Sequence, residues 1–316
     1  MWNKKKTKGY NVNKLKENYL YKSKNSLEFL KEIPSSDVDL VLTDPPYYIN
    51  EEMGIIRRSN SMKNYKYKWW DIDLKSEISF DWEQWKNKKE FLNWLFKHLD
   101  EYYRILKDNK HLILFCDKRN INHIQDYGES IGFKVRQILI WQKSNPVPRA
   151  RKISPMTTFE TAVWLTKGKA KVEHYNWELG MVHDIIKCPI PRKEWLDERH
   201  PTQKPLFLME VLVGLFSKPW ETVLDSFAGS GSTIVSALAM GREIIANDYD
   251  PTINEHDKWK KIFENNYKNR LNYAYKILKD KVAPFFLERK SSKTKIERVL
   301  ELLGLEKGAI KDIQDV

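Results

Sequence analysis

The sequence is poor in cysteine and has no long apolar stretch, and each absence excludes a class of protein. Cys116 and Cys188 are the only two cysteines in 316 residues, and they form no CxxC pair. A disulfide framework and a thiolate zinc site are therefore not expected, and no metal is predicted. No apolar run approaches the roughly 20 residues of a membrane span, and the basic residues 1–6 lack the apolar segment of a signal peptide. These absences predict a cytoplasmic protein without a membrane partner.

Positive charge is in excess along the chain. There are 55 Lys and Arg residues against 43 Asp and Glu residues, so the formal net charge is +12 and the isoelectric point is near 9.3. This excess favours a polyanionic partner such as nucleic acid; a lysine-rich solvated surface explains it equally well, and an anionic membrane is a weaker third alternative. Charge alone therefore does not decide the function.

Short apolar runs alternate with helix-like stretches over most of the chain. Strand patterns are expected at residues 38–43, 111–115, 133–141, 159–165, 222–225 and 241–248. Helical patterns are expected at residues 27–33, 91–106 and 206–216. The alternation predicts an α/β fold with a doubly wound, mostly parallel sheet.

Two internal segments and the end of the chain depart from this alternation. Residues 48–80 carry charges and aromatics over a length that is typical of a functional or mobile loop. Residues 167–199 lack a clean period and are expected to be irregular. We therefore expect one main domain over residues 1–283 and a small helical appendage over residues 284–316.

A glycine-rich turn at residues 225–233 (DSFAGSGST) lies between a predicted strand and a predicted helix. Glycines there allow a tight turn and close approach of the backbone to a ligand. The turn lacks the GK[ST] ending of a P-loop and the full dinucleotide pattern GxGxxG. Asp248, about 20 residues further on, ends the next strand, where a carboxylate accepts hydrogen bonds from ribose hydroxyls. Together they predict an adenosine-bearing cofactor without phosphates, although singly they also fit a packing turn and a helix N-cap.

The tetrapeptide Asp44-Pro45-Pro46-Tyr47 directly follows the apolar run at 38–43. Ligands bind at the carboxyl ends of strands in open α/β sheets, so the tetrapeptide is a candidate site. The prolines hold the Asp44 carboxylate and the Pro45 carbonyl as fixed acceptors, and Tyr47 can lie flat against a planar ring. This set suits a flat base that bears an amino group, and the alternative is an ordinary turn after a strand.

Three motifs in a fixed order resemble those of the beta class of amino-methylating DNA methyltransferases: DPPY at 44–47, RHPTQKP at 199–205 and FAGSGST at 227–233. The resemblance spans about residues 20–255 and implies the Rossmann-like fold of class I S-adenosylmethionine-dependent methyltransferases with a permuted motif order. It implies S-adenosylmethionine as cofactor and no metal, with Asp44, Pro45, Pro46 and Tyr47 as catalytic residues. Asn25 stands where relatives often carry aspartate. The implied cofactor contacts are Asn25, Asp44, His200, Thr202, Gln203, Lys204, Asp225, Phe227, Gly229, Gly231, Ser232 and Asp248.

The best-known members of this class methylate the adenine amino group N6 in double-stranded DNA, which is the reaction that the resemblance implies here. A minority methylate cytosine N4, more often with Ser in place of Asp44. The target base must flip out of the duplex at a cost of a few kcal/mol, and stacking on Tyr47 is worth about 1–3 kcal/mol. The class also implies a prokaryotic or phage-encoded protein, and leaves open a homodimer and a cognate restriction endonuclease as partners.

Basic residues interleave with aromatic ones in the 48–80 segment, which is typical of a loop that grips phosphates and stacks on bases. The alternative is a solvated loop whose aromatics pack on the core. By family position, residues 167–199 are expected to read the DNA sequence. An RNA or protein-amide methyltransferase and a catalytically silent DNA-binding relative are the rival interpretations. The predicted DNA contacts are Arg57, Arg58, Lys63, Lys66 and Lys68, with Lys143, Arg149, Arg151 and Lys152 as a second group.

Overall fold

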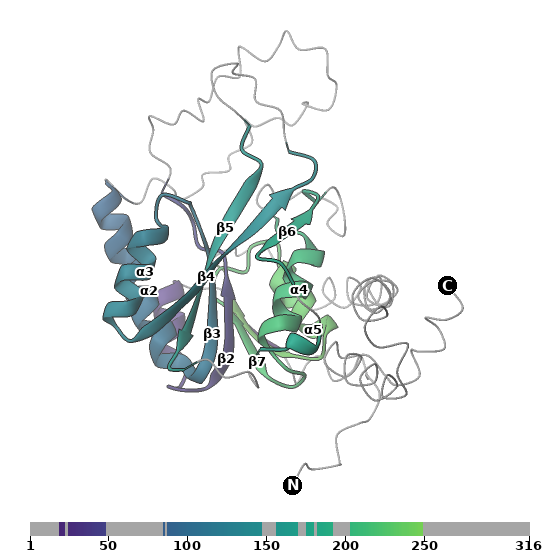
Figure 1. Cartoon of the computed structure of the whole chain (residues 1–316). Coiled ribbons are helices and arrows are strands. Elements are labelled where there is room, and N and C mark those ends of the chain that lie inside the picture. Colours follow the sequence, from purple (N-terminus) through teal and green to yellow (C-terminus); the bar gives the residue numbers. More distant parts are fainter. Residues whose placement is uncertain are drawn as a thin grey trace, which may run out of the picture.

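The computed structural model of the chain describes residues 19–22, 25–48, 85, 87–146, 156–169, 175–179, 182–191 and 203–248. Within these ranges, eight strands form one sheet in the order β1-β8-β7-β2-β3-β5-β4-β6 (Figure 1). The strands are β1 (Tyr19–Lys22), β2 (Val38–Thr43), β3 (Leu106–Cys116), β4 (Phe133–Lys143), β5 (Phe159–Lys167), β6 (Ile185–Cys188), β7 (Thr222–Asp225) and β8 (Glu243–Asn247).

Strand β5 runs against the direction that the other strands share. Strands β1, β8, β7, β2 and β3 pair in parallel, and β6 pairs in parallel with β4. Strand β5 is antiparallel to both of its neighbours, β3 and β4. The amino end of β5 therefore lies at the same edge of the sheet as the carboxyl ends of β2, β3 and β4. Glu160, in register with Trp141 of β4, is carried to that edge.

Helices cover both faces of the sheet (Figure 1). Helices α1 (Ser26–Glu32), α2 (Lys88–Ile105) and α3 (Ile121–Ser130) lie on one face, and α4 (Leu206–Phe216) and α5 (Ser232–Ala239) lie on the other. In β2, Leu40 and Leu42 pack with α4 and α5, whereas Val41 packs with α1 and α2. Because helices cover both faces of this strand, neither face meets solvent, and every residue of β2 is buried.

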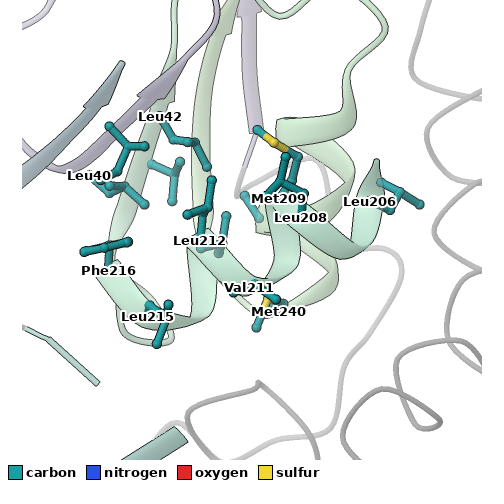
Figure 2. Packing of buried hydrophobic residues seen from close by; sticks show 14 of the residues in the cluster. Leu40, Leu42, Leu206, Leu208, Met209, Val211, Leu212, Leu215, Phe216 and Met240 are labelled. Carbon is teal, nitrogen blue, oxygen red and sulfur yellow. The ribbon is translucent and has the colours of Figure 1, made fainter. Parts of the chain in front are cut away.

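Helix α4 is apolar around its circumference except for Glu210, a pattern that predicts burial on all sides. Every residue of α4 except Phe207 is buried. Figure 2 shows Leu212 and Phe216 on the side of Leu40 and Leu42 of β2, and the other Leu, Met and Val side chains of the helix belong to the same cluster. Each fully buried Leu or Phe side chain contributes about 1.5–3 kcal/mol to stability. The burial of α4 fixes the chain that enters it, residues 203–205.

The sheet changes its winding between β2 and β7. These strands are neighbours, but the next helix after β2 is α2 on one face, and the helix after β7 is α5 on the other. Such a switch point leaves a crevice at the carboxyl ends of the two strands. The Thr43 hydroxyl donates a hydrogen bond to Asp225 Oδ1 at 2.7 Å and so ties the two strand ends together.

Most of the predicted elements are present, and β2, β7 and α4 have the predicted bounds. Two strands were not predicted: β1, in the basic stretch near the amino terminus, and β6, within the 167–199 range. The expectation that 167–199 is irregular is therefore wrong at 185–188. Both strands have four residues at a sheet edge, too few for a periodic pattern to stand out.

The predicted helical appendage at 284–316 lies outside the described residues, as does the 48–80 segment after Tyr48. None of the helices in the described ranges is long and apolar enough to cross a bilayer.

Candidate active site

The DPPY tetrapeptide leaves the sheet at the carboxyl end of β2, beside the crevice between β2 and β7. Proline has no main-chain N–H to donate to a strand ladder, so the two prolines end β2 at Thr43. Pro45 is buried, whereas Asp44 and Tyr47 are partly exposed. Asp44 keeps 21% of its side chain exposed.

Both oxygens of the Asp44 carboxylate have partners within the protein. The Tyr47 hydroxyl donates to Oδ1 at 2.5 Å, and the Lys204 ammonium donates to Oδ2. Lys204 precedes α4 and is only 5% exposed. Its Nζ lies 5.1 Å from the ring centre of Phe115 and 5.9 Å from that of Tyr47. Two ring faces and a carboxylate thus compensate for the water that the buried ammonium has lost.

A second carboxylate holds the same lysine. Glu160 Oε2 lies 3.1 Å from Lys204 Nζ, and Glu160 Oε1 lies 2.7 Å from Lys143 Nζ. Glu160 belongs to the amino end of β5, and Lys143 is the last residue of β4. The side chains of Tyr47, Asp44, Lys204, Glu160 and Lys143 therefore form one continuous row of polar contacts. We call these five residues the charged row.

Burial and mutual charge set the protonation of the charged row. Burial raises the pKa of the Asp44 carboxyl above its usual value; Lys204 opposes that shift and Glu160 adds to it. Burial alone would lower the pKa of Lys204, but the Asp44 and Glu160 carboxylates raise it. Burial alone would raise the pKa of Glu160, but Lys204 and Lys143 lower it on balance. At neutral pH Lys204 is therefore an ammonium and cannot act as a base, and Glu160 is an anion.

The glycine-rich turn joins β7 to α5 on the other side of the crevice. Gly229 and Gly231 have φ angles of 49° and 75°, in the left-handed region that glycine adopts most readily. Gly231 directly precedes α5, whose first residue, Ser232, is buried. The Gly229 N–H donates to the Asp248 carboxylate, which follows β8. The turn thus brings the partly exposed Gly229 and the Asp248 carboxylate together beyond the carboxyl end of β7.

Phe227 places an aromatic ring between this turn and α2. Its ring centre lies 5.6 Å from that of Trp94 and 5.4 Å from that of His98. His98 Nε2 is hydrogen-bonded to Ser26 Oγ at 2.8 Å, and burial lowers the pKa of His98 to about 4, so the ring is neutral. The Asn25 side chain accepts main-chain N–H hydrogen bonds as the N-cap of α1. This cap is the role that the described contacts give Asn25, and its cofactor contact stays a prediction.

Asp225 is enclosed between β2 and the glycine-rich turn. The Phe227 N–H donates to Oδ1 at 3.1 Å, in addition to the hydrogen bond from the Thr43 hydroxyl. Burial raises the pKa of Asp225 to about 6, although hydrogen bonds from Thr233, Thr43 and the Phe227 N–H oppose the shift. These hydrogen bonds hold the first residues of the glycine-rich turn against the end of β2. A direct cofactor contact of Asp225 stays a prediction.

Gln203 is the neighbour of Lys204 and is also buried. Its Nε2 has no hydrogen-bond partner among the described residues. A buried donor left without an acceptor costs about 1–3 kcal/mol, which a ligand oxygen at this point would recover. His200 and Thr202 of the same motif lie outside the described ranges.

Of the predicted DNA contacts, the structure describes Lys143, and its ammonium pairs with Glu160. Outside the described ranges lie Arg57, Arg58, Lys63, Lys66, Lys68, Arg149, Arg151 and Lys152. In the part of the chain that is described, no group of three or more His, Cys, Asp or Glu side chains could hold a metal ion.

Sequence reasoning did not join Lys204 and Glu160 to Asp44. It placed Lys204 at the cofactor and gave Glu160 no role. One signal was available, because Glu160 is the only acid in the strand-like run at 159–165. The direction of β5, which brings Glu160 to the same edge as Asp44, could not be read from that run.

Comparison with known proteins agrees with this geometry. The model of the N6/N4 methyltransferase family, described as DNA methylase, matches residues 38–259. The type II methyltransferase M2.DpnII of Streptococcus pneumoniae is 28% identical over 249 residues, which cover 76% of this chain and 86% of that protein. The type II methyltransferase M.HinfI of Haemophilus influenzae is 30% identical over 233 residues, which cover 69% of this chain and 61% of that longer protein.

Solved structures of DNA methyltransferases share the fold. The complex of M1.HpyAVI with S-adenosylmethionine has a TM-score of 0.52 at 21% identity and covers 79% of this chain and 99% of its own. The cytosine-N4-specific PvuII DNA methyltransferase has a TM-score of 0.54 at 18% identity, and the match covers 80% of this chain and 93% of that protein. The family match spans more than half of the sequence, with the DPPY tetrapeptide and the glycine-rich turn inside it, and the chain therefore belongs to the N6/N4 DNA methylase family.

Proposed function

We propose that this DNA methylase transfers a methyl group from S-adenosylmethionine to the N6 amino group of an adenine in double-stranded DNA. The observation that carries the proposal is the Asp44 carboxylate, which stands beside Tyr47 at the switch point between β2 and β7. An amino group is oriented by acceptors, and a carboxylate is a stronger acceptor than the serine hydroxyl expected at this position in most cytosine-N4 enzymes. Cytosine N4 is therefore the second candidate target.

The glycine-rich turn fits S-adenosylmethionine in three respects. The left-handed Gly229 and Gly231 let a ligand approach the backbone closely. The Asp248 carboxylate accepts hydrogens from ribose hydroxyls and would repel a phosphate. The buried Gln203 amide has no acceptor within the described ranges, and the methionine carboxylate of the cofactor would supply one. We assign these four residues and Phe227 to holding the cofactor.

When bound, S-adenosylmethionine supplies an electrophilic methyl carbon and leaves as a neutral thioether, with the electron pair of the broken C–S bond on sulfur. The lone pair of an adenine amino nitrogen is delocalised into the ring, so it must be localised before the nitrogen can attack. Asp44 and the Pro45 carbonyl do this by accepting the two amino hydrogens. As the N–C bond forms, positive charge grows on the nitrogen, and a preorganised carboxylate stabilises it by several kcal/mol. The nitrogen then loses one proton to Asp44 or to water.

Tyr47 has two tasks in this scheme. Its ring offers a stacking surface worth about 1–3 kcal/mol to the flipped base, which offsets part of the cost of unpairing. Its hydroxyl occupies Asp44 Oδ1 in the structure. The incoming amino group takes the place of that hydroxyl, so the acceptor is kept oriented until the target arrives.

Double-stranded DNA is the proposed partner, with phosphate contacts from the basic residues of the 48–80 segment and sequence reading by residues 167–199. The methyltransferase domain is proposed to span residues 1–283, with residues 284–316 as a separate helical appendage. The relatives are named type II methyltransferases, which supports a role in a restriction–modification system with a cognate endonuclease. Homodimer formation and a cytoplasmic location belong to the same proposal.

Nucleoside mass spectrometry tests the target. DNA is incubated with the purified protein and isotope-labelled S-adenosylmethionine, digested to nucleosides and analysed for labelled N6-methyladenine and N4-methylcytosine. We expect labelled methyladenine alone. Labelled methylcytosine without methyladenine would instead show that the target is cytosine N4. The absence of both products would favour a DNA-binding protein without catalytic activity. DNA binding should weaken steeply as salt rises, because phosphate contacts release counterions.

A further inference from the structure

Glu160 is the charged side chain nearest to Asp44 and Lys204 that the proposed reaction leaves without a task. Its carboxylate lies between two ammonium groups, 3.1 Å from Lys204 Nζ and 2.7 Å from Lys143 Nζ. A largely buried carboxylate costs stability unless it is paired, and an apolar residue at this position of β5 would avoid that cost. The presence of a charge here therefore calls for a reason other than packing.

We propose that Glu160 is a positioning residue for methyl transfer, which holds Lys204 against Asp44 and offsets the charge of that lysine at the reacting nitrogen. The inference rests on the proposed function, in which Asp44 faces the target amino group. Glu160 does not touch the target itself in this scheme. It acts through Lys204.

The offset follows from the charges of three neighbouring groups. Asp44 and Lys204 alone form a neutral pair, and the ammonium opposes the positive charge that grows on the target nitrogen. With Glu160 on the other side of Lys204, these three groups carry one net negative charge. Lys143, which pairs with Glu160, makes the whole charged row neutral, but it is not among the charges that shift the pKa of Asp44. The net negative charge of the three groups attracts the developing cation, and the limited exposure of Asp44, Lys204 and Glu160 to water strengthens the attraction.

The positioning follows from the contacts of Lys204. The ammonium donates a hydrogen bond to Asp44, forms an ion pair with Glu160 at 3.1 Å and lies against the rings of Phe115 and Tyr47. From that position it anchors Asp44 Oδ2 and leaves Oδ1 for the amino group. Without Glu160 the ammonium loses one of its two anchors, and the Asp44 carboxylate becomes less well oriented.

The remaining titratable groups at Asp44 cannot replace Glu160. They are the Tyr47 hydroxyl on the same loop and the Cys116 thiol at the end of β3. Burial raises the pKa of Tyr47 well above its usual value and that of Cys116 to about 12. Both groups are therefore neutral at neutral pH, and Lys143 has the opposite sign of charge.

Methyl transfer by Glu160→Gln tests the inference, with single-turnover reactions for the rate of the chemical step and steady-state reactions for kcat and KM. The matched control is Glu101→Gln, because Glu101 is a similarly shielded glutamate that pairs with Arg104 on α2, away from the crevice. We expect kcat to fall about tenfold or more in E160Q, with KM for DNA and for S-adenosylmethionine changed by less than about threefold. E101Q should match the wild type.

The pH profile separates positioning from a merely structural role. The Glu160 carboxylate raises the pKa of Asp44, so removing its charge lowers that pKa. The acid limb of kcat should therefore move to lower pH in E160Q. A limb that stays in place while kcat falls would overturn the inference.

A double-mutant cycle with Lys204→Met tests whether Glu160 acts through the lysine. Removing Glu160 should therefore slow methyl transfer less in the K204M background than in the wild-type background. The comparison of K204M with E160Q/K204M also tests the inference if the single variant E160Q does not fold. Losses that add would overturn the inference. A wild-type protein that methylates no DNA would instead refute the proposed function, which keeps the two failures apart.

Discussion

Replacing Asp44 by alanine should separate methyl transfer from DNA binding. The carboxylate is the acceptor that the proposed reaction places at the amino group, and removing one preorganised partner of a transition state costs about 2.7–4 kcal/mol, or a factor of about 100 to 1,000 in rate. Stability should fall much less. Lys204 keeps Glu160 at 3.1 Å, so the variant does not leave an isolated buried ammonium, whose cost would be about 3–5 kcal/mol. We expect the free energy of unfolding to fall by roughly 1–2 kcal/mol.

Three measurements are needed on this variant. Single-turnover transfer of a labelled methyl group gives the rate, fluorescence anisotropy with labelled DNA gives the Kd, and urea unfolding gives the stability. Asp37→Ala is the matched control, because Asp37 is an exposed aspartate at the other end of β2. We expect D37A to behave like the wild type and D44A to bind DNA within about twofold of it. A D44A rate within about fivefold of the wild-type rate would refute the acceptor role.

Three further predictions follow from the site. Asp248→Asn should weaken S-adenosylmethionine binding by about 10-fold to 100-fold, because a charged acceptor for ribose hydroxyls is lost; calorimetry that finds an unchanged Kd would remove Asp248 from the cofactor site. Asp225 has a pKa raised to about 6, so its contribution to stability is present at low pH and is lost as pH rises from about 4 through about 6. The free energy of unfolding of the wild type should fall by about 2–3 kcal/mol over that window because of this group, and that of Asp225→Asn should not. If urea unfolding shows the same change between pH 4.5 and pH 7.5 in both proteins, the raised pKa of Asp225 is contradicted. Lys143→Gln should leave the salt dependence of DNA binding unchanged, because its ammonium pairs with Glu160. If the slope of log K for DNA binding against log salt concentration is smaller by about one in this variant, Lys143 contacts a phosphate instead.

The central elements of the fold could be predicted because their residues carry strong local signals. Strand β2 is a mostly apolar run that is followed by Asp44 and two prolines, and α4 is apolar except for Glu210. The glycine-rich turn and Asp248 could also be predicted to meet, since each follows one of two strands joined by a single helix. The hydrogen bond from the Gly229 N–H to Asp248 has this origin.

The charged row could not be predicted, because it depends on strand order and strand direction. Asp44 and Lys204 are 160 residues apart in the sequence, and Glu160 faces them only because β5 is reversed. No periodicity encodes that reversal. The edge strand β6 could not be predicted for a related reason. Its four residues form a strand because they pair with β4, and they are too few to show a strand pattern of their own.

The reversal of β5 also affects how such a protein can change over time. Because β4 and β5 are antiparallel neighbours, the connection between residues 143 and 159 leaves and re-enters the sheet at one edge, the edge of the charged row. A connection between parallel strands has to cross the whole layer, so altering it displaces a helix. This one is under no such constraint, and lengthening it costs little free energy. A change in the length of this connection should therefore leave every strand register, and the chemistry at Asp44, as it was.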